Sequence, residues 1–98
     1  MEDGKYVVVR AASAGCFAGH LVEYDRIAKH VVLKSARRLW YWNGAASLSQ
    51  LAMEGVTKPD DCKFSVPTDR HEIAGVDEVI DVPAAAEANL KAVPVWRR

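Results

Sequence analysis

Residues 37–42 read Arg-Arg-Leu-Trp-Tyr-Trp, so two arginines and three of the eight aromatic residues fall within six positions. Side chains of an extended strand alternate between its two faces. One face then carries Arg38, Trp40 and Trp42, and the other carries Arg37, Leu39 and Tyr41. Only one of these faces can belong to an ordinary core, so this run constrains the fold and the function together.

Guanidinium groups bind phosphate and aromatic rings stack on bases, so residues 37–42 favour a planar, anionic ligand such as a nucleotide. Aromatic residues on a strand also serve as core or interface anchors, and the sequence leaves that alternative open.

The composition is that of a globular chain, and its length predicts a single domain over residues 1–98. Basic and acidic side chains number 13 each, so no global field attracts DNA or an anionic membrane. Cys16 and Cys62 form no CxxC pair, which is typical of reduced, cytosolic thiols. No signal-peptide pattern and no apolar run of membrane-spanning length is present, so we expect a soluble, intracellular protein without a membrane partner.

Hydrophobic patterning predicts an α+β fold in which a curled antiparallel sheet of five or six strands, barrel-like, is accompanied by two short helices. β-branched and aromatic runs predict strands at residues 5–10, 16–24, 30–34, 35–42, 62–66 and 72–82. Gly19 is expected at a bulge or a close backbone approach, and Ala74-Gly75 should bend the last strand. A capping box at residues 47–50 begins a helix that ends at Gly55, and Pro83 opens the second helix.

Two further segments extend the candidate site around the arginines and aromatics. The turn at residues 13–15 offers consecutive amides and a hydroxyl as an anion nest, although it also reads as a plain hairpin turn. The helix beginning near Ser47 offers free amides to an anion, unless Ser47 only caps it. The candidate ligand-binding residues are Ser13, Gly15, Phe17, Arg37, Arg38, Trp40, Tyr41, Trp42, Asn43 and Ser47.

Other chemistries find little support in the sequence. The potential metal ligands are Cys16, His20, Cys62 and His71. Their spacing matches no zinc pattern, and the two cysteines are expected as buried apolar residues. No Walker loop, dinucleotide fingerprint, nucleophile elbow or HExxH motif occurs. The sequence therefore predicts no metal, no cofactor, no catalytic residue and a protein that is not an enzyme.

Several motifs together resemble a family of short phage and prophage proteins of unknown function. These motifs are residues 6–10, 13–15, 17–19, 36–42, 44–52, 62–64 and 93–96. Such proteins are similar to anti-defence sponges such as the Thoeris anti-defence one family, from which no ligand residue is transferred here. The resemblance implies a protein in the cytoplasm of an infected bacterial host that sequesters a cyclic ADP-ribose isomer or a cyclic oligonucleotide without cleaving it. It also implies a homo-oligomer, because so short a chain can hardly enclose such a ligand alone.

Three alternatives remain open. The aromatic strand is a protein interface if the chain is a phage structural or host-takeover interaction module that binds no small ligand. Single-stranded nucleic acid is a second option, supported by Arg97-Arg98 and opposed by the neutral net charge. The third is an enzyme that cleaves the signal.

Overall fold

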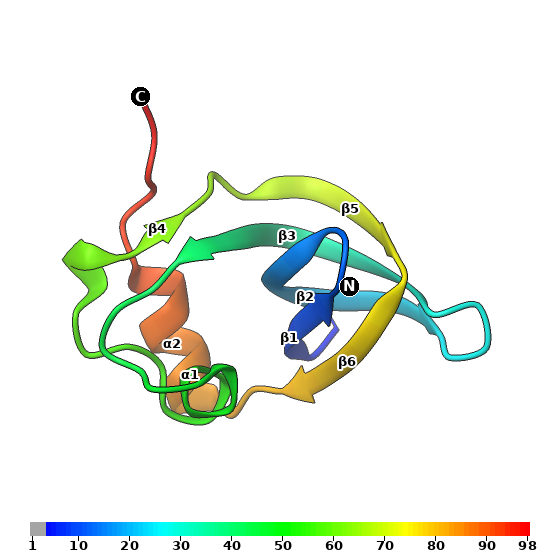
Figure 1. Ribbon diagram of the computed structural model, residues 1–98, viewed down its shortest axis with the longest axis horizontal. Helices are drawn as coiled ribbons and strands as arrows, with labels where there is room; N and C mark the ends of the chain where they lie inside the picture. Colours follow the sequence, from blue (N-terminus) through cyan, green and yellow to red (C-terminus); the bar gives the residue numbers. More distant parts are fainter. Residues whose placement is uncertain (1–3) are drawn as a thin grey trace.

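The computed structural model describes residues 4–98, so residues 1–3 of the predicted domain lie outside the described part. Figure 1 shows a curled sheet with both helices gathered beside one end of it. The elements in chain order are β1 (Tyr6–Ala11), β2 (Gly15–Asp25), β3 (His30–Tyr41), α1 (Leu48–Glu54), the 3-10 turn η1 (Pro59–Asp61), β4 (Lys63–Phe64), β5 (Thr68–Ala74), β6 (Val76–Asp81) and α2 (Ala84–Ala92). The predicted α+β class is confirmed, with six strands in one sheet among the described residues.

All strand pairs of the sheet are antiparallel, in the order β4-β3-β2-β1-β6, and β5 also pairs with β3. The consecutive strands β5 and β6 therefore lie at opposite edges of the sheet, where β5 pairs with β3 and β6 pairs with β1. Gly75, whose φ is 68°, turns the chain between them, as the predicted bend at this position requires. The strands curl as expected, but the described part of the sheet is not closed, so the word barrel applies only loosely.

β1 is buried on both faces and so separates two cores. Its odd-numbered residues, such as Val7, face an inner core enclosed by the curl, and its even-numbered residues, such as Val8, face the helices. The inner core contains Val7, Val9, Ala11, Phe17, Val31, Leu33, Ala36, Ile73 and Val76. The helix-side core contains Tyr6, Val8, Ala18, Leu39, Leu51, Ala52, Val56, Cys62, Phe64, Leu90 and Val93. A short chain thus covers both faces of its central strands.

β3 is one continuous strand of 12 residues, so the predicted division into strands 30–34 and 35–42 is wrong. An extra residue is absorbed at Ser35, whose φ is 53°, where the β2–β3 register shifts. Gly19 lies in the same irregularity. A Cβ atom on it would lie 3.1 Å from the Cα atom of Ala36, so the predicted close backbone approach is confirmed.

Both predicted helices are present, and their ends follow the sequence signals. The Ser47 hydroxyl accepts a hydrogen bond from the Gln50 amide at 3.1 Å, and the helix ends at Gly55 with a φ of 80°. Pro83, expected at the first helical position, is the N-cap residue of α2, which begins one residue later at Ala84. Beyond this helix the amide of Trp96 donates to the Phe64 carbonyl at 2.9 Å. The C-terminal segment is therefore fixed to β4 through its main chain.

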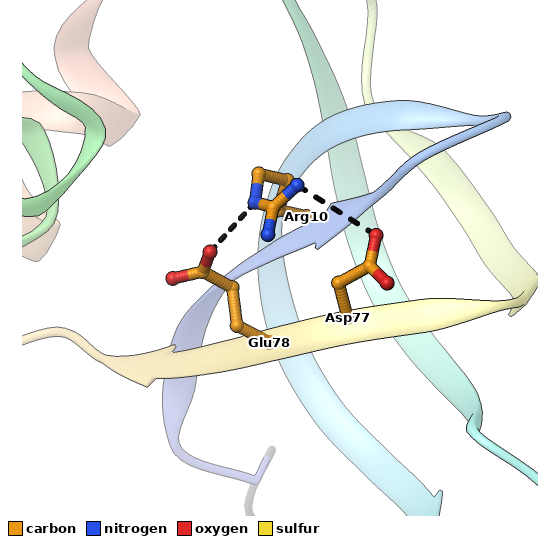
Figure 2. Close-up of polar contacts among 3 residues, drawn as sticks. All are labelled: Arg10, Asp77 and Glu78. Atoms are coloured by element: carbon orange, nitrogen blue, oxygen red, sulfur yellow. Dashed lines mark hydrogen bonds and ion pairs between the residues drawn. The ribbon is translucent and has the colours of Figure 1, made fainter.

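The adjacent carboxylates Asp77 and Glu78 meet Arg10 on the outside of the sheet, as Figure 2 shows. The Nε atom of Arg10 donates to Glu78 at 2.6 Å, and its Nη1 atom lies 3.7 Å from an oxygen of Asp77. Arg10 and Glu78 are also paired in the register of β1 with β6. These ion pairs support the β1–β6 edge, and because they are exposed they contribute little to stability.

Candidate ligand-binding site on β3

Arg37 is almost fully buried, with 4% of its surface exposed. Each of its five N–H groups meets a main-chain carbonyl. The acceptors are Ser65 at 3.0 Å from Nε, Leu90 and Val93 at 3.2 and 2.8 Å from Nη1, and Phe64 and Pro94 at 3.4 and 3.2 Å from Nη2. A guanidinium has only five N–H groups, so none is left for a phosphate. The expectation that Arg37 binds the ligand directly is not supported by this geometry.

Arg37 instead ties three segments together. Its acceptors belong to the C-terminal end of α2, to the following tail, and to the residues at β4. Carbonyls at the end of a helix carry partial negative charge, so they suit a cation. Burial lowers the pKa of Arg37, and its carbonyl partners compensate the lost hydration.

Arg38 lies on the other side of β3 and is only half-buried. Its Nη1 atom donates to the Ala14 carbonyl at 3.0 Å, and its guanidinium carbon lies 4.7 Å from the centroid of the Phe17 ring. The structure therefore brings Arg38 to the β1–β2 turn that contains Ser13 and Gly15. Phe17 itself is buried in the inner core, so its ring supports Arg38 and offers no stacking surface.

Exposed aromatic rings gather where β3 ends. Trp40 is 66% exposed, Tyr41 is 49% exposed and Trp96 in the tail is 39% exposed. Tyr41 pairs with Lys63 of β4, and the ammonium of Lys63 lies 5.3 Å from the Trp96 ring. We call Trp40, Tyr41, Lys63 and Trp96 the aromatic edge. Arg98, whose guanidinium carbon lies 5.9 Å from the Trp96 ring, adds a second cation.

The predicted alternation along residues 37–42 holds as far as Trp40 and then fails. The register of β3 with β4 shifts between Leu39 and Tyr41, so Trp40 is an extra residue in the pairing. Beyond this bulge, Tyr41 becomes exposed and Trp42 packs on the helix-side core together with Leu39. Trp42 was expected on the face of Trp40, and the bulge is the physical reason that it is not there.

Asn43 and Ser47 lie in the segment that follows β3, apart from the Arg38 contacts. The Asn43 amide donates to the sulfur of Cys62 at 3.4 Å, and the Ser47 hydroxyl is engaged as the helix cap. α1 is also only seven residues long. The predicted residues therefore lie apart: Ser13, Gly15 and Arg38 at the β1–β2 turn, Trp40 and Tyr41 at the aromatic edge, Asn43 and Ser47 before α1, and Phe17, Arg37 and Trp42 against the two cores. They do not form one enclosed pocket.

Lys63 and Trp96 belong to the aromatic edge but were missing from the predicted site. Trp96 stands beside two arginines in the sequence, and this composition was the available signal. Its proximity to Lys63 depends on the main-chain bond from Trp96 to Phe64, which joins residues 32 positions apart (96 less 64). No local pattern predicts such a contact.

Other types of site find no match among the described residues. No group of three or more His, Cys, Asp or Glu residues within 4–98 could hold a metal ion. Burial raises the pKa of the half-buried Cys16 thiol, which makes it less reactive at neutral pH. Among the helices of residues 4–98, none has the length and apolar character needed to cross a bilayer.

A family described as a domain of unknown function (DUF6948) matches residues 4–90 of the chain. No curated protein and no solved structure matches it. The matched part contains Trp40, Tyr41 and Lys63 but ends before Trp96. The match gives no activity, so the resemblance to phage sponges stays a prediction.

Proposed function

The chain belongs to the DUF6948 family, and we propose that it binds a nucleotide-type ligand at the aromatic edge without cleaving it. The observation that carries this proposal is the set of exposed rings interleaved with cations. Tyr41 lies opposite Lys63, and Lys63 lies over the Trp96 ring. Aromatic rings stack on bases of any sequence, and neighbouring ammonium and guanidinium groups attract phosphate.

The exposure of Trp40 supports the same reading. A side chain that is 66% exposed contributes little to the core, and its place at a bulge turns it outward. Bulges commonly redirect side chains beside functional sites. A base stacked on Trp40 would lie on the same strand as Arg38, whose guanidinium carries no ion pair with residues 4–98.

The free energy of ligand binding indicates whether one copy of the chain is enough. Stacking contributes about 1 to 3 kcal/mol per base. Two stacked bases therefore fall short of the roughly 12 kcal/mol of a nanomolar complex. A second copy of the chain that supplies an opposite wall would close the difference. Sequestration of a cyclic ADP-ribose isomer or cyclic oligonucleotide, which the resemblance implies, requires such an oligomer.

A single-stranded nucleic acid is the second candidate, and one observation favours it. The aromatic edge is open and continues into Arg97 and Arg98 at the chain end, which suits an extended strand better than a compact signal. The equal numbers of acidic and basic residues weaken this candidate, because they supply no global attraction.

The test is calorimetric titration of the full chain with cyclic ADP-ribose isomers, cyclic di- and trinucleotides, and a short oligothymidylate. Trp40→Ala should weaken binding of the active ligand about tenfold or more, since one stacking contact is lost. Ile27→Ala is the matched control, because Ile27 is 97% exposed at the β2–β3 turn, a different part of the sheet. That variant should bind like the unaltered chain.

Four outcomes separate the possible functions. A cyclic nucleotide that binds and is recovered intact supports the proposal, and a cleaved one would establish an enzyme. Binding only to the oligonucleotide, with a steep loss at higher salt, would replace the proposal by the second candidate. If no ligand of the panel binds and Trp40→Ala changes the sedimentation coefficient of the protein, the aromatic edge is a protein interface.

A further inference from the structure

A hollow of about 330 Å³ lies on the opposite side of β3 from Arg38. Its polar lining comes from Tyr6, His20, Ser35, Arg37 and Lys91, and Pro67, Val93 and Val95 form an apolar wall. The polar residues stand on β1, β2, β3 and α2, whereas Pro67 lies between β4 and β5 and the two valines lie in the tail. Strands and a helix therefore hold the polar side of the hollow, and its volume is at the lower end for small-molecule sites.

The local charge of the hollow is positive. Arg37 forms no ion pair with residues 4–98, so its carbonyl partners satisfy its N–H groups and leave its charge in place. Lys91 adds a second cation, and its only carboxylate partner within 4–98 is Glu87 at 2.6 Å. Two positive groups thus face one negative group, and a buried uncompensated charge favours an anion beside it.

Hydrogen-bonding capacity in the hollow is also unused. The Tyr6 hydroxyl forms no hydrogen bond with residues 4–98, and no fully buried side-chain N or O atom of this part lacks a partner, so the hydroxyl is the accessible end of an otherwise buried side chain. Burial raises the pKa of Tyr6 to about 12; the charge of Arg37 opposes this rise, and the charge of Glu87 adds to it. The hydroxyl therefore keeps its proton at neutral pH and remains a donor. The ammonium of Lys91 lies 5.2 Å from the same ring.

His20 also lines the hollow, and its ring is held in place by two contacts. Its Nδ1 atom lies 2.8 Å from the Gly4 carbonyl. A carbonyl only accepts, so Nδ1 is the donor in this hydrogen bond. The ring is held edge to face against Tyr6 at 5.1 Å between centroids.

We propose that this hollow binds a small monocarboxylic acid, with its carboxylate at the Tyr6 hydroxyl and the Lys91 ammonium and its apolar body against Val93 and Val95. The field of Arg37 favours the anion without a direct contact, because its N–H groups are all engaged. A phosphate would need more donors than Tyr6 and Lys91 provide, and it would leave the apolar wall unused. This site is separate from the aromatic edge and does not rest on the nucleotide proposal.

The test uses sodium benzoate as the probe and nuclear magnetic resonance of the labelled full chain as the readout. Saturable shifts are expected for the His20 ring and for the amides of Lys91 and Val93. Benzamide, a neutral molecule of the same shape, and inorganic phosphate should produce no saturable shift at the same concentrations.

Two variants make the test specific. Tyr6→Phe removes only the hydroxyl, which has no hydrogen bond with residues 4–98, and should weaken benzoate binding about tenfold. Lys91→Met keeps most of the side chain and should weaken it several-fold. Tyr41→Phe removes a hydroxyl on the aromatic edge and should leave it unchanged. Equal binding of benzamide, unchanged affinity in Tyr6→Phe, or shifts that rise without saturation would each overturn the proposal.

Discussion

The two sides of β3 treat neighbouring arginines in opposite ways. Arg37 is buried against the end of α2, with all five N–H groups bonded to carbonyls. Arg38 lies over Phe17, donates to one carbonyl and stays half-buried. Two identical residues adjacent in sequence therefore differ in role because alternation points them at different surroundings. The comparison teaches that a pair of arginines on a strand does not by itself make an anion site.

Replacing each arginine by methionine tests this comparison, and Arg37→Met should have the largest effect on the free energy of unfolding. Arg37→Met leaves buried carbonyls of β4, α2 and the tail without donors, and we expect it to lower the free energy of unfolding by about 3 to 5 kcal/mol. Urea denaturation measures this loss directly. The released tail should also increase the proteolytic sensitivity of the segment that contains Trp96.

Arg38→Met is the matched control, since it changes the same side chain one residue further along. It removes one hydrogen bond and one cation–π contact at a half-buried position. The expected loss is about 1 kcal/mol. Equal losses in the two variants would contradict the division of roles between the two sides of β3.

The next largest effect is the pH dependence of stability caused by Tyr6, which lies on the same side of β3 as Arg37. Burial raises its pKa to about 12 from the ordinary value of 10. Between these values the unfolded chain loses the phenol proton and the folded chain keeps it, so stability falls as the pH rises from about 10 to about 12. The contribution lost is about 2 to 3 kcal/mol.

Unfolding of the unaltered chain and of Tyr6→Phe, measured across this alkaline range, checks the effect. The difference between the two chains cancels the titration of the lysines they share. It should change with pH only above about pH 10. A constant difference would show that folding does not raise the pKa of Tyr6.

The sequence predicted features that depend on local chemistry. The cap at Ser47, the helix end at Gly55 and the bend at Gly75 each follow from a residue and its immediate neighbours. The continuity of β3 could not be predicted, because Ser35 adopts a positive φ that its residue type does not indicate.

The candidate site follows the same division between local and distant causes. The extended conformation of residues 37–41 is predicted correctly, but the surroundings of the two arginines are not. The carbonyls that bind Arg37 lie 27 to 57 positions away in the chain, so its burial is set by tertiary contacts. The bulge at Trp40 depends likewise on pairing with β4.

The smallest effect concerns His71 and sharpens the comparison from the Arg38 side. Burial, and then the charge of Arg38, lower the pKa of His71, whose ring lies 4.9 Å from that of Phe17. The folded chain therefore binds this proton less readily than the unfolded chain, and stability falls as the pH drops below the ordinary histidine value of about 6.5. In Arg38→Met the pKa of His71 should rise but stay below the ordinary histidine value, because burial remains.

Histidine resonances followed during a pH titration measure this shift, with Arg10→Met on the outer β1–β6 edge as control. An unchanged pKa of His71 in Arg38→Met would mean that burial alone lowers this pKa and that the charge of Arg38 does not act on the His71 ring.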